Sequence, residues 1–269
     1  MNTNSIININ NNNIQDSIPK IIFIVPYRDR ELHKKLFEKA MKHNLIDLES
    51  YKIYYIHQHD NRVFNRGAMK NIGFLIIKNL YPSNYKDITF VFHDIDVWGI
   101  NKDIIKYDTN KNRVKHFYGF TYALGGIVSI KGCDFELSKG YPNYWGWGFE
   151  DNMFNDRCLD VGLEIDRNNF YNIQDKNIHH ELDEIKKPYN KRNLSIYKFE
   201  NSDTLFDIQD IEYNIQHNDI FNMVNITNFK SYYHDTDYIH GIHDIRNGTK
   251  ILINKNHMRR NWNMKTMFT

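Results

Sequence analysis

The chain has 269 residues, 41% of them hydrophobic, which is long enough to bury a core in one large domain. Its formal net charge of +2 creates no global field for holding nucleic acid or an anionic membrane, so neither partner is expected. Two cysteines, Cys133 and Cys158, cannot build a disulfide framework. Two free thiols in a reducing compartment are the simplest interpretation, with a single bridge as the alternative.

The first 19 residues are rich in Asn and Ile. They lack the basic start and continuous apolar stretch of a secretory signal, and no run of 18 apolar residues occurs anywhere. We therefore expect residues 1–19 to be a disordered leader. The expected protein has no membrane span and is cytoplasmic or otherwise soluble.

The next part of the chain alternates short apolar runs with amphipathic stretches. Strands are expected at residues 21–25, 51–57 and 88–92, and helices at residues 31–48 and 67–80. The order strand, helix, strand, helix, strand predicts an α/β fold with a mostly parallel central sheet. Ligands of such sheets bind beyond the carboxyl ends of the strands.

Later segments are less regular. Residues 118–130 predict a strand and a turn, residues 141–148 a loop, and residues 150–161 a helix, and strand-like patterns follow residue 201. The expected organisation is a globular domain over residues 20–229 and a C-terminal extension over residues 230–269.

Two carboxylates, Asp94 and Asp96, directly follow the third apolar run. In an extended strand end, positions i and i+2 point the same way, so both are expected on one side. Hard oxygen ligands suit Mn²⁺ or Mg²⁺, which commonly bridge to a diphosphate. The same spacing also occurs in surface turns, as we expect for Asp235-Thr236-Asp237, which follows no apolar strand.

Three arginines are candidates for binding phosphate. Arg28 and Arg30 stand just past the first strand, and Arg66 stands just before a helix. Guanidinium groups match phosphate oxygens well. Placement at the ends of strands favours this role over that of ordinary surface arginines.

The segment from Tyr144 to Asp151 reads Tyr-Trp-Gly-Trp-Gly-Phe-Glu-Asp. Trp faces stack on the apolar faces of sugar rings, and glycines allow a loop to approach a ligand closely. Acids at a helix N-terminus also interact with the helix dipole, which is the alternative role for Glu150 and Asp151. The complete string favours a sugar-binding site.

Adjacent histidines, His179 and His180, follow this helix. Either could supply one imidazole to a metal ion beside Asp94 and Asp96. In a chain with 13 histidines, a surface pair is the alternative.

Taken in order, these segments resemble the β-1,4-galactosyltransferases, the family-7 glycosyltransferases, over roughly Ile21 to Phe229. Phe149 stands where the family usually has Gly, and Asn152 where it usually has Asp. The resemblance rests on residues 23–30 (Phe-Ile-Val-Pro-Tyr-Arg-Asp-Arg), Phe64-Asn65-Arg66 with Asn71-Ile72-Gly73-Phe74, residues 90–96 (Phe-Val-Phe-His-Asp-Ile-Asp), and Gly125-Gly126 with residues 144–151.

The resemblance implies a GT-A fold, a Rossmann-like fold of nucleotide-diphospho-sugar transferases, with a bound Mn²⁺ or, alternatively, Mg²⁺. Asp96 and His180 would be metal ligands, with His179 as the rival histidine. Asp151 would be the catalytic base, with Glu150 beside it. The acceptor would contact Tyr144, Trp147, Gly148, Asp151 and Asn152. The UDP-sugar would contact Pro26, Tyr27, Arg28, Arg30, Phe64, Arg66, Asp94, Ile95, Gly125, Gly126 and Trp147.

The implied function is inverting, metal-dependent transfer of a sugar, galactose by default, from a UDP-sugar to a hydroxyl group. The acceptor would be a glycan, a glycopeptide or another hydroxyl compound, and the new bond would be a β-glycosidic bond. The alternative is a lectin-like module that has the fold without catalysis. Asp96, Glu150 and Asp151 together favour the enzyme, because binding alone would not need all three acids.

Overall fold

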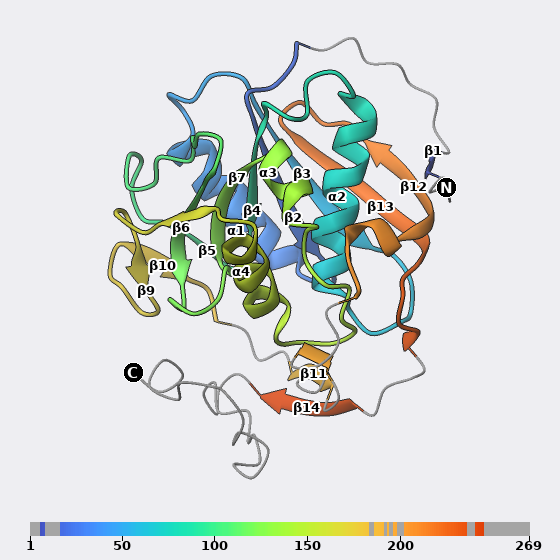
Figure 1. The fold of residues 1–269 in the computed structure, drawn as a ribbon. Coiled ribbons are helices and arrows are strands. Elements are labelled where there is room, and N and C mark those ends of the chain that lie inside the picture. Colours follow the sequence, from blue (N-terminus) through green and yellow to red (C-terminus); the bar gives the residue numbers. More distant parts are fainter. Residues whose placement is uncertain are drawn as a thin grey trace.

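The structure is a computed structural model that describes residues 6–8, 17–182, 186–190, 193, 196–197, 202–235 and 240–244. One large sheet forms its centre (Figure 1). In order across this sheet the strands are β1 (Ile6–Asn8), β12 (Gln209–Gln216), β13 (Phe221–Lys230), β3 (Tyr51–Gln58), β2 (Ile21–Tyr27), β4 (Thr89–His93), β7 (Ile127–Lys131), β6 (Arg113–Gly119) and β8 (Glu164–Asp166), with β9 (Tyr171–Asn172) also paired to β6.

Four central strands, β13, β3, β2 and β4, run parallel, whereas the pairs β12–β13, β4–β7 and β6–β7 are antiparallel. The predicted α/β fold with a mostly parallel central sheet is confirmed. Among the described residues, two small antiparallel pairs lie outside this sheet: β5 (Val97–Gly99) with β10 (Ile178–His180), and β11 (Lys186–Asn190) with β14 (His240–Asp244).

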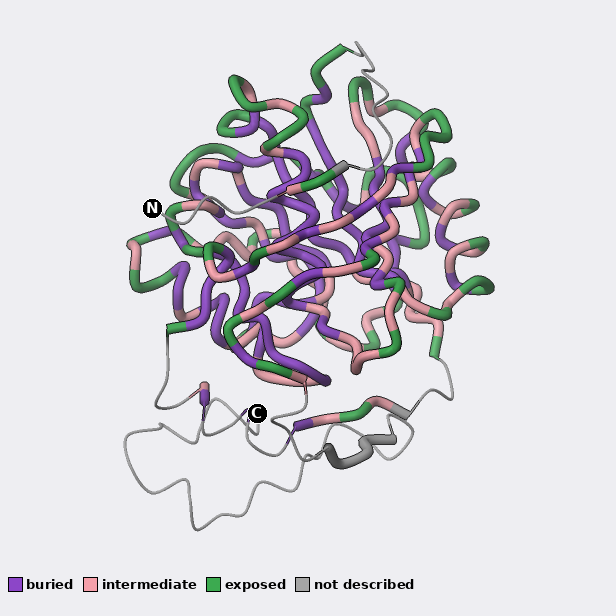
Figure 2. Tube along the Cα trace, turned by 90° about the vertical axis from the view of Figure 1, so that its right-hand side faces the viewer, coloured by how far each residue is buried: buried purple, intermediate pink, exposed green. Residues whose placement is uncertain are grey.

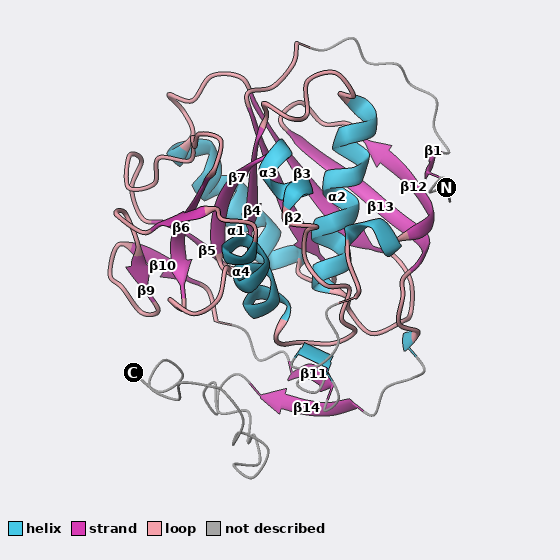
Figure 3. Cartoon of the chain, viewed as in Figure 1, coloured by secondary structure: helices cyan, strands magenta, loops and turns pink. Residues whose placement is uncertain are grey.

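The helices cover both faces of the sheet, with α2 and α4 on one face and α1 on the other (Figure 3). Successive side chains of β2 therefore enter different cores: Ile22 and Ile24 pack beneath α2, and Phe23 and Val25 pack against α1. This is why the strand is an unbroken apolar run. Figure 2 shows the resulting buried interior. The helices are α1 (Glu31–Asn44), α2 (Arg66–Leu80), α3 (Gly132–Leu137), α4 (Glu150–Asp160) and the 3₁₀ turn η1 (Leu205–Asp207).

The boundaries of the helices differ slightly from the expected ones. Helix α1 ends at Asn44 rather than at residue 48, and it buries His33, Phe37 and Met41, which lie one turn apart. Leu32, an apolar residue of the same helix, is 64% exposed. Helix α2 begins one residue early, because Asn65 caps it: Oδ1 of Asn65 accepts the N–H of Ala68 at 2.8 Å.

Strands β2 and β4 separate at their carboxyl ends. Their pairing stops at Ile24 and Phe92, whereas β2 continues to pair with β3 as far as Tyr27. Pro26 fits here because the edge facing β4 needs no backbone N–H. The chain goes from β2 to β3 on one side and then to β4 on the other, so this is the switch point where ligands of such sheets bind.

The two ends of the described chain add strands at the periphery. In the segment expected to be a disordered leader, Ile6–Asn8 pairs in parallel with β12 as an edge strand.

Cys133 and Cys158 are both free, so the alternative of a bridge is wrong. Asp235 is half-buried, whereas Thr236 and Asp237 lie outside the described residues. None of the described helices has the length and apolar character needed to cross a membrane.

Candidate active site

Arg66, at the start of α2, is the centre of a cluster of acids. Its Nε donates to Oε1 of Glu150 at 2.8 Å, and its Nη1 donates to Oδ2 of Asp94 at 2.8 Å. Its Nη2 donates to Oδ2 of Asp151. Burial works to lower the pKa of Arg66, but Asp151, Asp94 and Glu150 together raise it well above its ordinary value. Arg66 is therefore a permanent cation that joins β4, α2 and α4.

The two carboxylates after β4 have different partners. Strand β4 ends at His93, and residues 95 and 96 form a turn, so the expected extended conformation is wrong. Asp94 binds Arg66, whereas Oδ2 of Asp96 accepts a hydrogen bond from Nη1 of Arg30 at 3.2 Å. Burial works to raise the pKa of Asp96, but the charges of Lys187 and Arg30 outweigh it and hold that pKa below its ordinary value.

The arginines divide in the same way. Arg30 and Arg66 both face acids of the cluster. Arg28 instead lies against the loop after β3, where its Nη1 donates to the carbonyl oxygen of Arg62 at 2.6 Å. Its guanidinium carbon lies 5.9 Å from the ring centroid of Phe64. The loops after β2 and β3 are thereby joined.

The acids that open α4 are partly enclosed. Glu150 is only 3% exposed, and burial raises its pKa although Arg66 opposes the shift. One of its oxygens accepts the N–H of Gly148 at 3.1 Å, so it also fixes the preceding loop. Gly125 lies so close that an added Cβ would stand 2.4 Å from Oδ2 of Asp151, and the neighbouring Gly126 has φ +69°.

The loop before α4 divides into a buried and an accessible part. Tyr144 is 1% exposed, so the prediction that it contacts an acceptor does not fit its position in the core. Trp145 is equally buried and stacks on Phe229 at a centroid distance of 5.4 Å. Trp147 is half-buried, and its backbone N–H donates to the carbonyl oxygen of Pro188 in β11 at 2.7 Å.

Phe149 adopts the left-handed conformation with φ +68°. That conformation is unfavourable for a bulky residue. Its ring stacks on Tyr197 at a centroid distance of 5.6 Å. Asn152, which is predicted to contact the acceptor substrate, is half-buried, and its side-chain amide donates to the carbonyl oxygen of Tyr122 at 3.3 Å.

Strand β10 places the two histidines differently. His180 pairs with Val97 in β5, next to Asp96, and its Nδ1 lies 3.1 Å from the hydroxyl of Tyr118. His179 stacks on Trp98 at 4.5 Å and lies 2.7 Å from a carboxylate oxygen of Glu181. These contacts leave His180, rather than His179, beside Asp96.

A carboxylate and an imidazole suit Mn²⁺, which accepts both oxygen and nitrogen ligands. No three His, Cys, Asp or Glu side chains gather into a complete metal site within the part of the chain that is described. A divalent ion held by few protein groups and by substrate phosphates requires no such complete cage. Asp96 and His180 therefore fit a site that a diphosphate completes.

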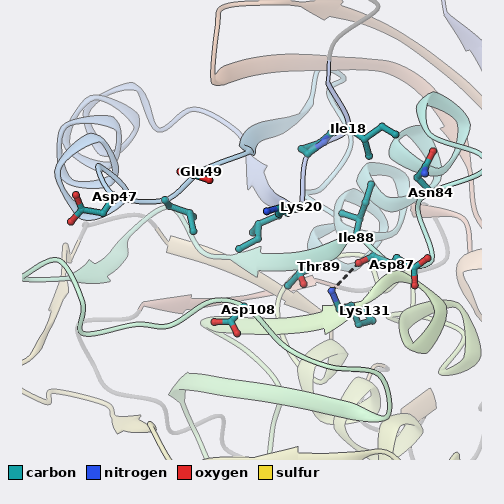
Figure 4. Close-up of a pocket in the computed structure, with 13 residues that line it drawn as sticks. Ile18, Lys20, Asp47, Glu49, Asn84, Asp87, Ile88, Thr89, Asp108 and Lys131 are labelled. Atoms are coloured by element: carbon teal, nitrogen blue, oxygen red, sulfur yellow. Dashed lines mark hydrogen bonds between the residues drawn. The ribbon is translucent and has the colours of Figure 1, made fainter.

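In the part of the chain that the structure describes, cavities lie at both ends of the central strands. One of about 460 Å³ lies at the carboxyl ends of β2 and β3 and is lined by residues 28–29 and 57–62. A larger one of about 590 Å³ lies at the other ends of β2 and β4 and is lined by Lys20, Asp87 and Lys131 among others (Figure 4). The smaller cavity is the one that Arg28 lines, at the same strand ends as the cluster around Arg66.

Sequence reasoning missed a layer of polar residues beneath the site. Asn71, on the buried side of α2, donates to the carbonyl oxygen of Tyr141 at 2.7 Å and to Oδ1 of Asn143 at 2.9 Å. Lys70 is 1% exposed and donates to Oδ1 of Asp151 at 2.9 Å. The available signal was the pair Lys70-Asn71 inside an otherwise apolar stretch of α2.

Comparison with known proteins follows the same segments. The N-terminal region of glycosyl transferase group 7 matches residues 13–109, and the N-terminal domain of galactosyltransferase matches residues 108–181. β-1,4-Galactosyltransferase 1 of Mus musculus is 30% identical over an alignment of 190 residues, and the match covers 64% of this chain and 45% of that protein. The chain belongs to the β-1,4-galactosyltransferase family.

Other members of the β-1,4-galactosyltransferase family show the same relation. β-1,4-Galactosyltransferase 7 of Drosophila melanogaster is 28% identical over an alignment of 167 residues, and the match covers 56% of this chain and 48% of that protein. The chain thus spans about half the length of the curated relatives it matches.

Solved structures of this family support the fold. The catalytic domain of Drosophila β-1,4-galactosyltransferase 7 in complex with xylobiose superposes with a TM-score of 0.66 at 21% identity, covering 82% of this chain and 97% of that one. A variant of the same enzyme, in complex with manganese, UDP-galactose and xylobiose, gives a TM-score of 0.63. The predicted GT-A fold is confirmed.

Proposed function

We propose that this chain is an inverting, metal-dependent glycosyltransferase that moves a sugar from a UDP-sugar to an acceptor hydroxyl. One observation carries the proposal: Arg66 joins Asp94, Glu150 and Asp151 at the switch point of the sheet, beside Asp96 and His180. The relative crystallised with manganese and UDP-galactose makes galactose the default sugar and Mn²⁺ the default metal.

The donor would bind across the carboxyl ends of β2 and β4. Arg30 and Arg66 would hold the diphosphate with their guanidinium groups. The cavity beside Arg28 would take the nucleoside, since the Arg28 guanidinium that lines it also lies against the aromatic ring of Phe64. The remaining predicted donor contacts, Pro26, Tyr27, Ile95, Gly125 and Gly126, line the same strand ends and turns.

Asp96 and His180 would hold the metal ion. When bound, a divalent cation stabilises the negative charge that develops on the departing diphosphate. Arg30 and Arg66 would add positive charge at the same place. The protein would thus concentrate cations where the leaving group forms.

Asp151 would act as the general base. The acceptor oxygen forms a bond to the anomeric carbon, and its proton passes to the carboxylate of Asp151. The bond between that carbon and the diphosphate oxygen breaks on the opposite side, and its electron pair leaves with UDP. One displacement inverts the anomeric configuration. Trp147, Gly148 and Asn152, on the accessible part of the loop and α4, would contact the acceptor and limit the entry of water.

The test is UDP release from a panel of UDP-sugars with Mn²⁺, with and without free sugar acceptors. We expect turnover with one or more donors, its loss in EDTA and its recovery with added Mn²⁺. Replacing Asp151 by Asn should retain UDP binding and abolish transfer. A protein that binds sugars without releasing UDP would be a lectin-like module, and full turnover in EDTA would remove the metal from the mechanism.

A further inference from the structure

Lys70 is an unusual residue in the interior of this protein. It lies in α2, one turn after Arg66, and its side chain is 2% exposed. Among the buried residues of the described chain it is the only lysine. Lysine is almost never fully buried unless it is paired, and an apolar residue at such a position commonly packs equally well. Its charge therefore requires an explanation.

The charge is directed at the proposed catalytic base. Nζ of Lys70 donates to Oδ1 of Asp151 at 2.9 Å, and it lies 4.1 Å from the ring centroid of Tyr141. The other oxygen of Asp151, Oδ2, is the one that Arg66 binds. The backbone of Asp151 is fixed as well, since its carbonyl oxygen accepts the N–H of Leu124 at 2.9 Å.

The two cations of this cluster, Arg66 and Lys70, differ in how many acids they form ion pairs with. Arg66 is shared among Asp94, Glu150 and Asp151, and it stands at the edge where the donor diphosphate would bind. Lys70 forms an ion pair with Asp151 from inside the core. A diphosphate that engages Arg66 would weaken the contact of Arg66 with Oδ2, whereas the buried amine of Lys70 cannot follow it.

We propose that Lys70 is a positioning residue that holds Oδ1 of Asp151, so that Oδ2 is the oxygen that receives the proton of the acceptor once Arg66 engages the donor. This inference rests on the proposed function and makes it more specific. The acceptor O–H bond breaks, its proton moves to Oδ2, and the new bond to the anomeric carbon forms as UDP leaves. Lys70 keeps its own proton throughout and supplies a fixed charge.

The charged and titratable groups around Asp151 must be known in order to interpret how kcat depends on pH. Arg66 and Lys70 face it from α2, and Glu150 neighbours it in α4. Among the described residues, Tyr141, from the loop before α4, and His116, from β6, also interact with it electrostatically. Lys70 is the one whose removal takes away a positive charge without touching the proposed donor site.

The experiment replaces Lys70 by Met, which is unbranched and uncharged. In the full chain with Mn²⁺ and the best donor, we expect kcat to fall at least tenfold while the dissociation constant of UDP stays within threefold. The acid limb of kcat against pH should move to higher pH, because the loss of a positive neighbour favours the protonated carboxyl group. A role in packing alone would not shift this limb.

Lys78→Met is the matched control. Lys78 is also in α2, but it pairs with Glu136 away from the acids, so its replacement should leave the pH profile unchanged. If Lys70→Met does not fold, Lys70→Gln keeps an N–H donor without the charge, and its acid limb is expected to move in the same direction. An unchanged acid limb in either folded variant overturns the inference while transfer by the unmodified chain still upholds the function. Absence of transfer by the unmodified chain would overturn both.

Discussion

Acid should destabilise this protein through His116, which supports the turn that carries Gly125. Nε2 of His116 lies 3.0 Å from the carbonyl oxygen of Tyr118 and 3.1 Å from that of Gly125, while Nδ1 lies 3.1 Å from Nε of Arg167. Carbonyl oxygens only accept and Arg167 only donates, so the proton is on Nε2 and Nδ1 accepts. Protonating Nδ1 would replace this hydrogen bond by repulsion between two cations.

The magnitude follows from the shift in pKa. Burial, reinforced by the charge of Arg167, lowers the pKa of His116 from 6.5 to about 4. As the pH falls below 6.5, the unfolded chain takes up this proton first, so the stabilisation is complete above that pH and is lost as the pH falls toward 4. The loss from this residue amounts to about 2 kcal/mol in the free energy of unfolding between pH 8 and pH 5.

Urea unfolding followed by Trp fluorescence at pH 8 and pH 5 measures this loss. His93, with a pKa lowered to about 4 by burial, and Asp203, with a pKa raised to about 7 by burial, also titrate, so the diagnostic quantity is the difference between variants. His116→Gln should lose about 2 kcal/mol less than the unmodified chain over this interval. His43→Gln, an exposed control, should lose the same amount as the unmodified chain. Equal losses in all three proteins would refute the assignment of a buried neutral imidazole.

Three further predictions concern the site and its support. An added Cβ at Gly67 would stand 2.0 Å from the carbonyl oxygen of Pro142. Gly67→Ala should therefore lower the free energy of unfolding by about 3 kcal/mol. In the control Gly99→Ala, the nearest atom to the new Cβ would be 3.4 Å away, and the free energy of unfolding should change by less than about 1 kcal/mol. Gly125→Ala should fold but lose at least tenfold in kcat in the transfer assay, because the new methyl group would displace Oδ2 of Asp151. His180→Ala should weaken Mn²⁺ binding in the presence of UDP at least tenfold by calorimetry and His179→Ala less than threefold; the reverse order would exchange their roles.

Much of the site could be predicted because parallel strands bring their carboxyl ends to one edge. Arg30 after β2 and Asp96 after β4 are 66 positions apart, and they form an ion pair because both strands end at the same switch point. Arg66 and Asp151 meet for a related reason, since α2 and α4 start at this edge. Residue type and position at the ends of predicted elements pointed to Arg30, Arg66 and Asp96, whereas the aromatic and Gly-rich string before α4 pointed to Asp151.

Other contacts could not be predicted, because they depend on which segments pack over others. Tyr144 and Trp145 were indistinguishable from Trp147 in the sequence, yet Phe229 of β13 covers Trp145 and leaves Trp147 half-buried. The sequence did not show which acid Lys70 would pair with, because its partner Asp151 lies in a different helix, α4. The edge strand Ile6–Asn8 pairs with a strand some two hundred residues away, and no local pattern encodes such a partner.

The sequence by itself determined the order of strands and helices, the edge of the sheet that carries the site and the chemical types gathered there. It could do so because burial on two faces requires continuous apolar strands, and polar residues can follow only where such strands end. The tertiary structure alone decided which acid each cation binds and which aromatic side chains stay accessible. Those pairings depend on distances of a few ångströms between elements that are remote in the chain, and only the packed fold sets such distances.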